Sequence, residues 1–479
     1  MDLPVDEERL RADVEATAEF GAIDAPEGRG RTVLAGTEAN REAREYFVER
    51  LDDAGLDVRI DGVGNVAGRW ELESAEPDAP AVAAGSHLDS VVEGGIFDGP
   101  LGTYAALEAV RAMQDAEVES LRKPIEVVCF TEEEGGRFAS GLLGSSVAAG
   151  VRSAADALAL TDSDGVTLDD ALEDIGYRGE GRLNAGEWDA WLELHIEQGT
   201  RLESMGKEVG IVTTVTGITH CDVTIAGETD HAGTTPMGTR TDALAAASEL
   251  IADVERAGRR AAGIGVDADA DYSPGDETER RNADAETDTD ADEDTEADVD
   301  MDAESDANDD SDSGDDSDSG DDRDNEGTAV ATVGRIDARP NATNVVPGRV
   351  DLGIDIRDVT REPIERVVNA VEASLARLET ERGVETTLAR PLDVPPTPMA
   401  ERCQGVLRRQ SNETAISSTA FHSGAAHDTM HVARVTDAGM LFAPSRGGYS
   451  HSPREWTDWA DCAAATRVLA GALADLAGV

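Results

Sequence analysis

Residues 123–135 read KPIEVVCFTEEEG, a short run of apolar and β-branched residues that ends in three glutamates. Such a run, bounded by proline and glycine, predicts a strand that is buried on both faces of a sheet. A second run, AVAAGSHLDS at 81–90, also ends in polar groups, and the helix-like segment GPLGTYAALEAVRAMQD at 99–115 follows it. Strand, polar tip and helix in alternation predict an α/β domain, a mixed sheet with helices on both faces. In such sheets the site lies beyond the carboxyl ends of the strands, where these polar groups fall.

The chain is too long, at 479 residues, for one compact core. From about residue 214 the pattern changes to about four strands and two helices, and the α/β pattern returns after a proline-rich stretch, PLDVPPTP at 391–398. We therefore predict an α+β domain, residues 214–392, inserted into a catalytic domain made of residues 1–213 and 393–479. Residues 6–55 have charged and apolar residues at helix spacing, and we predict that they are helical.

Acidic residues dominate the composition: 101 aspartates and glutamates stand against 41 lysines and arginines, a net charge of −60. Nucleic acid and anionic membranes repel such a chain, so we expect neither as a partner. Between Asp267 and Glu326 there are 29 acidic residues and only three arginines. We predict a disordered acidic insert at 264–327, with an ion or partner site as the alternative. The rest stays acidic and poor in lysine, as expected of a halophilic protein.

The sequence also indicates the cellular compartment of the protein. No apolar run is long enough to span a bilayer, and the acidic N-terminus lacks the layout of a signal peptide. The four cysteines are far apart and form no CxxC pair, which disfavours a disulfide framework or a thiolate zinc site. We therefore predict a cytoplasmic protein.

Five short segments carry the histidines and carboxylates that borderline divalent cations prefer. These residues are His87 and Asp89 in GSHLDS, Asp98 in FDGPLG, Glu133 and Glu134 in TEEEGGRF, His195 in ELHIEQG, and His451 in GGYSHSP. Each segment alone is a weak signal, because a single histidine is more often packed in a core or exposed. The chain has only eight histidines, and several of them fall in polar segments at strand ends. The set predicts a hydrolase with two divalent ions, which could be zinc, manganese, cobalt or nickel.

The two ions need a shared oxygen ligand, and Asp98 is the predicted bridge. We expect His87 and His195 to complete one site, and Glu134 and His451 the other.

Two further carboxylates have predicted roles beside these ligands. Asp89, two residues after His87, is expected to accept the second ring N–H of that histidine and to fix its tautomer. Glu133 is next to a ligand but is not needed as one. It is the predicted general base, which moves a proton from water to the leaving nitrogen.

These segments resemble the zinc-aminopeptidase-like amidohydrolases of the hydantoinase/carbamoylase branch, which includes N-carbamoyl-L-amino-acid hydrolase, allantoate amidohydrolase and β-ureidopropionase. The resemblance covers nearly the whole chain outside the acidic insert and rests on GSHLDSVVEGGIFDGPLG, TEEEGGRF, LELHIEQG, DHAGTTPM, PNATNVVPG, DIRD, SGAAHD and PSRGGYSHSPRE. It implies that the inserted domain is a lid through which two subunits form a homodimer.

The resemblance also implies an activity, hydrolysis of the linear C–N bond of a ureido acid. An N-carbamoyl-L-amino acid is the first expectation, with amino acid, carbon dioxide and ammonia as products. Allantoate hydrolysis is the nearest alternative, and an N-acyl-amino-acid deacylase or peptidase is a more distant one. A catalytically silent ion-binding protein is the alternative without enzyme activity.

The resemblance further implies residues that contact substrate. His231 is expected to polarise the scissile carbonyl as a catalytic oxyanion donor, close to Gln198. The residues expected to complete the substrate site are Asn344 and Arg357, which would hold the carboxylate, and His427 and Gly448.

Overall fold

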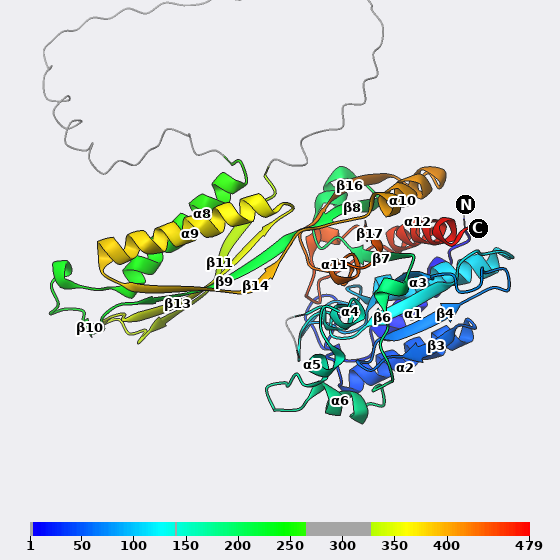
Figure 1. Cartoon of the computed structure of the whole chain (residues 1–479), viewed down its shortest axis with the longest axis horizontal. Coiled ribbons are helices and arrows are strands. Elements are labelled where there is room, and N and C mark those ends of the chain that lie inside the picture. Colours follow the sequence, from blue (N-terminus) through cyan, green and yellow to red (C-terminus); the bar gives the residue numbers. More distant parts are fainter. Residues whose placement is uncertain (1–2, 139–140, 265–326) are drawn as a thin grey trace, which may run out of the picture.

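The computed structural model describes residues 3–138, 141–264 and 327–479, which fold into two parts connected by long strands (Figure 1). The acidic insert that we predicted to be disordered, 264–327, lies outside the described residues except at its two ends.

The larger part is built on a nine-stranded mixed sheet with the order β15-β8-β17-β7-β5-β6-β4-β3, in which β16 also pairs with β8. Its strands are β3 (Asp57–Ile60), β4 (Val66–Trp70), β5 (Val82–His87), β6 (Ile125–Phe130), β7 (Ala190–Ile196), β8 (Val209–Val215), β15 (Thr397–Pro398), β16 (Ser418–Ser423) and β17 (Asp437–Ala443). The central strands β17, β7, β5 and β6 are parallel, and every residue of β5, β6 and β7 is buried. This burial explains their nearly continuous apolar sequences.

Helices cover both faces of this sheet. Alternate residues of β6 face different cores: Val127 belongs to one apolar cluster and Val128 to another. The first cluster lies under the helices α1 (Glu7–Thr17), α2 (Glu38–Asp53), α3 (Pro100–Asp115), α10 (Glu401–Glu413) and α12 (Trp459–Ala477). The opposite face carries α4 (Leu143–Ala148) and α11 (Thr429–Val432). The short helices α5 (Ala154–Leu158), α6 (Leu168–Asp174) and α7 (Arg201–Met205) lie in the connections.

The prediction of continuous helix over residues 6–55 is wrong in its middle. Helices α1 and α2 are separated by a small hairpin of β1 (Ala22–Ile23) and β2 (Gly30–Arg31). Gly28 lies in its turn at φ +81°, and a Cβ there would stand 1.7 Å from the carbonyl oxygen of Pro453. The turn residues of the segment APEGRG outweigh the helix periodicity on either side of it.

The smaller part is a four-stranded antiparallel sheet of β9 (Gly217–Ala226), β11 (Val330–Arg339), β13 (Arg349–Asp358) and β14 (Glu385–Val394), in the order β11-β13-β9-β14. Helices α8 (Ala243–Ala261) and α9 (Arg361–Arg382) pack together on one face of it over a separate apolar core. A short antiparallel pair, β10 (Asp230–His231) with β12 (Val345–Val346), lies at the end farthest from the larger part (Figure 1). We call this pair the lid tip.

The structure confirms the predicted fold class, a mixed α/β sheet with helices on both faces plus an inserted α+β domain. The domain limits at residues 213 and 392 stay a prediction, since β14 continues to Val394. Within the described ranges, no helix has both the length and the apolarity needed to cross a bilayer.

Candidate metal centre

The predicted ligands gather at one edge of the large sheet. His87 is the last residue of β5, His195 is next to last in β7, and Glu133 and Glu134 lie in the loop that follows the end of β6 at Phe130. The carboxyl ends of these strands meet at one edge because β7, β5 and β6 are parallel neighbours. Asp98 enters the same space from the turn that precedes α3.

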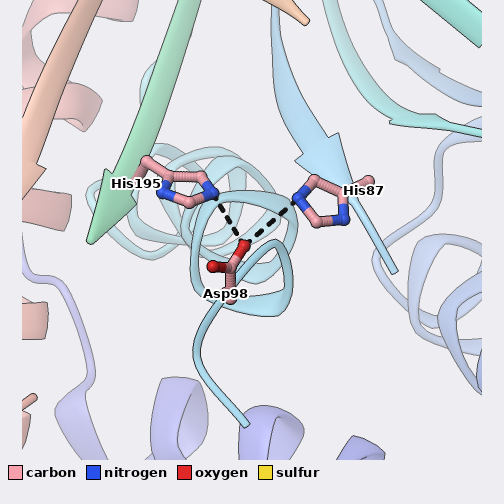
Figure 2. A group of neighbouring side chains, drawn as sticks. All are labelled: His87, Asp98 and His195. Carbon is pink, nitrogen blue, oxygen red and sulfur yellow. Dashed lines mark ion pairs between the residues drawn. The ribbon is translucent and has the colours of Figure 1, made fainter. Parts of the chain in front are cut away.

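Asp98 lies at the centre of this group. Its Oδ1 is 3.5 Å from Nε2 of His87 and 3.2 Å from Nε2 of His195 (Figure 2). Its Oδ2 is 3.6 Å from Nε2 of His451, which in turn lies 3.3 Å from Oε2 of Glu134. The two carboxylate oxygens therefore face different histidines, as a bridging ligand requires.

Backbone carbonyls fix the ring orientation of the two buried histidines. Nδ1 of His87 is 3.0 Å from the carbonyl of Asp89, and Nδ1 of His195 is 3.1 Å from the carbonyl of Ile196. A carbonyl can only accept, so each Nδ1 carries the hydrogen and each Nε2 is left to bind a ligand beside Asp98.

The expected role of the Asp89 carboxylate is therefore wrong in its detail. Its Oδ1 lies 3.8 Å from Nδ1 of His87, beyond hydrogen-bond distance, while the carbonyl of the same residue accepts the ring hydrogen. Its Oδ2 instead accepts the backbone N–H of Glu134 at 3.1 Å. Asp89 thus orients both predicted ligands, one through its main chain and the other through its side chain.

Three groups of described side chains place potential ligand atoms within 4.8 Å of one another. They are His87–Asp98–His195, Asp98–Glu134–His451 and His87–Glu133–Glu134. The first two share Asp98 and are the groupings expected from the sequence. The assignment of an ion to each of them stays a prediction.

The carboxylates of this cluster repel one another. Burial, with the negative charge of Asp98 added, raises the pKa of Glu134 to about 8. Burial raises the pKa of Glu133 well above its usual range, and Glu134 adds to this effect. Burial disfavours charge on His87, but Glu133 and Asp98 outweigh it and raise the pKa of that imidazole well above its usual value. The cluster therefore stabilises positive charge.

Unpartnered polar atoms indicate the same chemistry. Nε2 of His87, Oδ1 of Asp89 and Oε1 of Glu134 are buried and make no hydrogen bond within the described structure. Buried polar atoms without partners are rare and destabilising. Nitrogen and carboxylate oxygen are the ligands that borderline divalent cations take, so these residues fit metal ions.

Local backbone geometry holds the cluster in place. A Cβ on Gly99, where φ is +83°, would lie 2.5 Å from Cε1 of His87, so only glycine fits there. Leu142, Gln198 and His451 have positive φ values of 55°, 58° and 53°, which are uncommon for residues with side chains. Strained backbone of this kind concentrates at functional sites.

Two polar residues that the sequence analysis left unassigned support Asp98. Ser450 donates its hydroxyl to Oδ2 of Asp98 at 3.0 Å. Glu455 is buried, and its Oε1 accepts the backbone N–H groups of Phe97 at 2.8 Å and Asp98 at 3.0 Å. Both occur in the segment PSRGGYSHSPRE, and Ser450 directly precedes His451. Their closeness in sequence to a predicted ligand is the feature that could have identified them.

A cavity of about 540 Å³ extends from this cluster to the lid sheet, and both Gln198 and Arg357 line it. Nε2 of Gln198 donates to Oδ2 of Asp98 at 2.7 Å. Arg357 on β13 donates to both oxygens of Asp355 at 2.9 and 3.1 Å, and to the carbonyl of Gly424 at 2.8 Å. A guanidinium has five N–H donors, so N–H groups remain for a ligand.

Two predicted substrate residues of the lid lie away from this cavity. His231 is exposed in β10 at the lid tip, and the exposed Asn344 is next to it, where its carbonyl accepts the N–H of Ala232 at 3.0 Å. The lid sheet extends away from the large sheet (Figure 1), so its tip does not reach the cavity of its own chain. The expectation that both residues contact substrate therefore stays a prediction, and it requires that they reach the site of a neighbouring subunit.

His427 and Gly448 are also not among the described residues that line the cavity. His427 is buried behind His195, with ring centroids 4.7 Å apart, and its Nε2 is 3.0 Å from Oγ of Ser423. Burial, with His195 adding to it, lowers the pKa of His427 well below its usual value. Gly448 packs against Thr200. His427 thus packs against a predicted ligand, and its expected contact with substrate stays a prediction.

Comparisons with known proteins agree with this centre. The model of the peptidase family M20/M25/M40 matches residues 83–475. The chain is 33% identical to the N-carbamoyl-L-amino-acid amidohydrolase of Paenarthrobacter aurescens over 96% of each chain. It is 31% identical to the allantoate amidohydrolase of Bacillus subtilis, over 97% of this chain and 96% of that protein.

A solved structure has the same fold. The hydantoinase/carbamoylase-family amidase of Burkholderia multivorans superposes with a TM-score of 0.79 at 30% identity, over 99% of this chain and 98% of that one. With its candidate metal centre and this match over nearly the whole chain, the protein belongs to the peptidase family M20/M25/M40, in the hydantoinase/carbamoylase branch of metal-dependent amidohydrolases.

Proposed function

We propose that this protein hydrolyses the linear C–N bond of ureido acids, and that its substrate is an N-carbamoyl-L-amino acid. The observation that carries this proposal is the pair of ligand groups that share Asp98, at one end of a cavity that also reaches Arg357. The cavity can thus accommodate a reacting group and a carboxylate together, which is what a ureido acid presents.

The proposed cofactor is a pair of divalent ions, zinc, manganese, cobalt or nickel. His87 and His195 would hold one ion, Glu134 and His451 the other, and Asp98 both. When bound, such ions polarise a carbonyl and lower the pKa of water.

Glu133 is the proposed general base and acid. Its carboxylate lines the cavity, and Oε2 lies 3.7 Å from Nε2 of His87. It accepts a proton from water as the oxygen–carbon bond forms, and it gives that proton to the amino-acid nitrogen as the carbon–nitrogen bond breaks. The carbamic acid that remains decomposes to carbon dioxide and ammonia, so one water is consumed for each ureido acid cleaved.

Arg357 is the proposed partner of the substrate carboxylate, because it lines the cavity and has N–H groups beyond those that it donates to Asp355 and Gly424. Gln198, beside Asp98, is proposed to orient the ureido group.

We further propose a homodimer in which the lid tip of one subunit completes the site of the other. His231 and Asn344 are exposed at that tip and away from the cavity of their own chain. In the partner's site, His231 would donate to the developing oxyanion and Asn344 to the substrate carboxylate.

Allantoate amidohydrolysis is the second candidate, since one relative over nearly the full length is an allantoate amidohydrolase. A deacylase or peptidase is more distant, because the sequence HIEQG places His195 where peptidase relatives typically use a carboxylate. A silent ion-binding protein is disfavoured because Glu133 is present in the cavity although metal binding does not need it.

The test is ammonia release from N-carbamoyl-L-amino acids and allantoate, with purified protein in high salt and added Zn²⁺, Mn²⁺, Co²⁺ or Ni²⁺. We expect metal-dependent release that a chelator abolishes and that returning the metal restores. The chelated protein with Mg²⁺ added is the control for ionic strength. No release from any ureido acid by metal-loaded protein would falsify the proposal.

A further inference from the structure

One wall of the cavity is apolar and continuous. Leu142, Val394, Ala426 and Met430 line the cavity, and all four pack in the same apolar cluster, in which Met430 is only 2% exposed. They come from distant parts of the sequence, yet they make one surface. Covering apolar surface removes it from water and lowers the free energy, so this wall favours binding of an apolar group of a ligand.

The wall begins beside the proposed catalytic base. The backbone N–H of Leu142 donates to the carbonyl of Glu133 at 2.7 Å, and that of Leu143 donates to the carbonyl of Glu132 at 3.1 Å. Leu142 is held at a φ of 55°, the left-handed region, at the start of α4. These contacts fix the backbone of Leu142 beside Glu133, and both residues line the cavity, so an apolar group there would lie close to the reacting group.

The lid continues the same wall. Val394 on β14 is directly opposite Ile218 on β9, and both line the cavity. Two polar lid residues in the cavity lining, His220 and Arg357, already have a partner: each contacts Asp355 at 2.9 Å. A substrate side chain that lies against Leu142, Met430 and Val394 therefore meets carbon atoms from both domains.

Building on the function proposed above, we infer that the substrates are N-carbamoyl-L-amino acids with a large aliphatic or thioether side chain, and that this apolar wall binds that side chain. An allantoate molecule would place a second ureido group there, whose N–H and carbonyl groups would lose water without gaining partners on these residues. The wall thus selects between the two activities that are found among the relatives.

The first experiment compares kcat/KM for N-carbamoyl-L-leucine, N-carbamoyl-L-methionine, N-carbamoylglycine and allantoate, all with metal-loaded protein. We expect the leucine and methionine derivatives to exceed N-carbamoylglycine by about 10- to 100-fold, the gain from burying such a side chain, and to exceed allantoate as well.

Variants locate the effect. We expect Leu142→Ala to lower the leucine-to-glycine ratio of kcat/KM by about tenfold. Val394→Thr, which keeps the shape and adds a hydroxyl, should lower the ratio in the same direction and tests the wall even if Leu142→Ala folds poorly. The matched control is Leu244→Ala on α8, an exposed leucine (38%) that is not among the cavity residues, and the ratio should not change.

A leucine-to-glycine ratio near one, or faster turnover of allantoate, overturns this inference and leaves ureido-acid hydrolysis standing. Preference for N-carbamoyl-L-glutamate that Arg152→Gln removes also overturns it, because Arg152, one of the cations that line the cavity, would then select the side chain. No hydrolysis of any ureido acid removes both the inference and the proposed function.

Discussion

Glu455 shows how one side chain can position a ligand without touching a metal ion. Its Oε1 accepts the backbone N–H groups of Phe97 and Asp98, and burial raises its own pKa to about 8. We expect Glu455→Ala to weaken metal affinity by about 10- to 100-fold, as the loss of supporting residues does elsewhere. Glu455→Gln keeps an acceptor oxygen and should retain most of the affinity. Metal content after dialysis against a chelator series measures both variants, and equal affinities in Ala and Gln would contradict this role.

Substitution of Glu133 can test catalysis independently of metal binding. Neither of the two groups that share Asp98 contains it. We expect Glu133→Gln to lower kcat by about 10²- to 10⁴-fold, the usual contribution of a general base, with little loss of bound metal. Glu134→Gln is the matched comparison, since the same substitution one residue later should lower metal content. If Glu133→Gln loses metal to the same extent, then Glu133 is a ligand and not the base.

His431 is a half-buried histidine with a strongly shifted pKa. Burial lowers the pKa to about 4, and the positive charges of Arg434 and Arg152 add to this effect. In the unfolded chain this histidine takes up a proton near pH 6.5, whereas in the folded protein it does so only near pH 4. Between these values protonation favours the unfolded chain. The stability that neutral His431 provides is therefore complete above about pH 6.5 and is lost as pH falls toward about 4.

We therefore expect the free energy of unfolding of the wild type, relative to His431→Gln, to fall by about 2 to 3 kcal/mol between pH 7 and pH 4. Urea unfolding of both chains without metal, across this range, measures the difference. A constant difference would mean that the folded pKa of His431 is not depressed.

The lid tip is the element whose role depends on a second subunit. If His231 acts in the partner's site, Glu133→Gln and His231→Ala homodimers are each impaired, but a mixed dimer has one intact site. We expect mixing after dissociation to restore about a quarter of wild-type activity, because half of random dimers are mixed and each has one complete site. Mixing Glu133→Gln with Glu134→Gln is the control and should restore nothing. No recovery in the first mixture would show that His231 does not complete the partner's site.

Among the elements, those with a clear period were predicted well and those governed by turns were not. The segment RVDLGIDIRD alternates apolar and polar residues, and it is strand β13 with alternate residues buried. Residues 6–55 looked helical, yet the turn residues of APEGRG divide them, and the turn at Gly28 also packs against Pro453 far along the chain. A contact of that kind has no local signal in the sequence.

The charge of the whole molecule sets its response to salt. A net charge of −60 favours expansion, because like charges repel more in the compact state. The screening length falls from about 10 Å at 0.1 M salt to about 3 Å at 1 M, so the repulsion weakens. We expect Tm to rise steadily over this range in KCl, measured by circular dichroism.

Choline chloride at equal ionic strength is the control, since it screens equally and should raise Tm by the same amount. A rise in KCl alone would indicate specific ion binding. A rise of Tm with salt would support the predicted halophilic character of the protein, and a constant Tm would contradict it.

At the scale of the molecule, the sequence by itself determined the fold class and the residues that gather at the candidate metal centre. Strand ends, apolar runs and the order of motifs are local properties of the chain, and parallel neighbours bring their carboxyl ends to one edge. Only the tertiary structure decided which groups touch. It placed the Asp89 carbonyl rather than its carboxylate on His87, buried His427 behind His195, and moved His231 to the lid tip. These outcomes depend on contacts between segments distant in the chain, whose geometry no local pattern specifies.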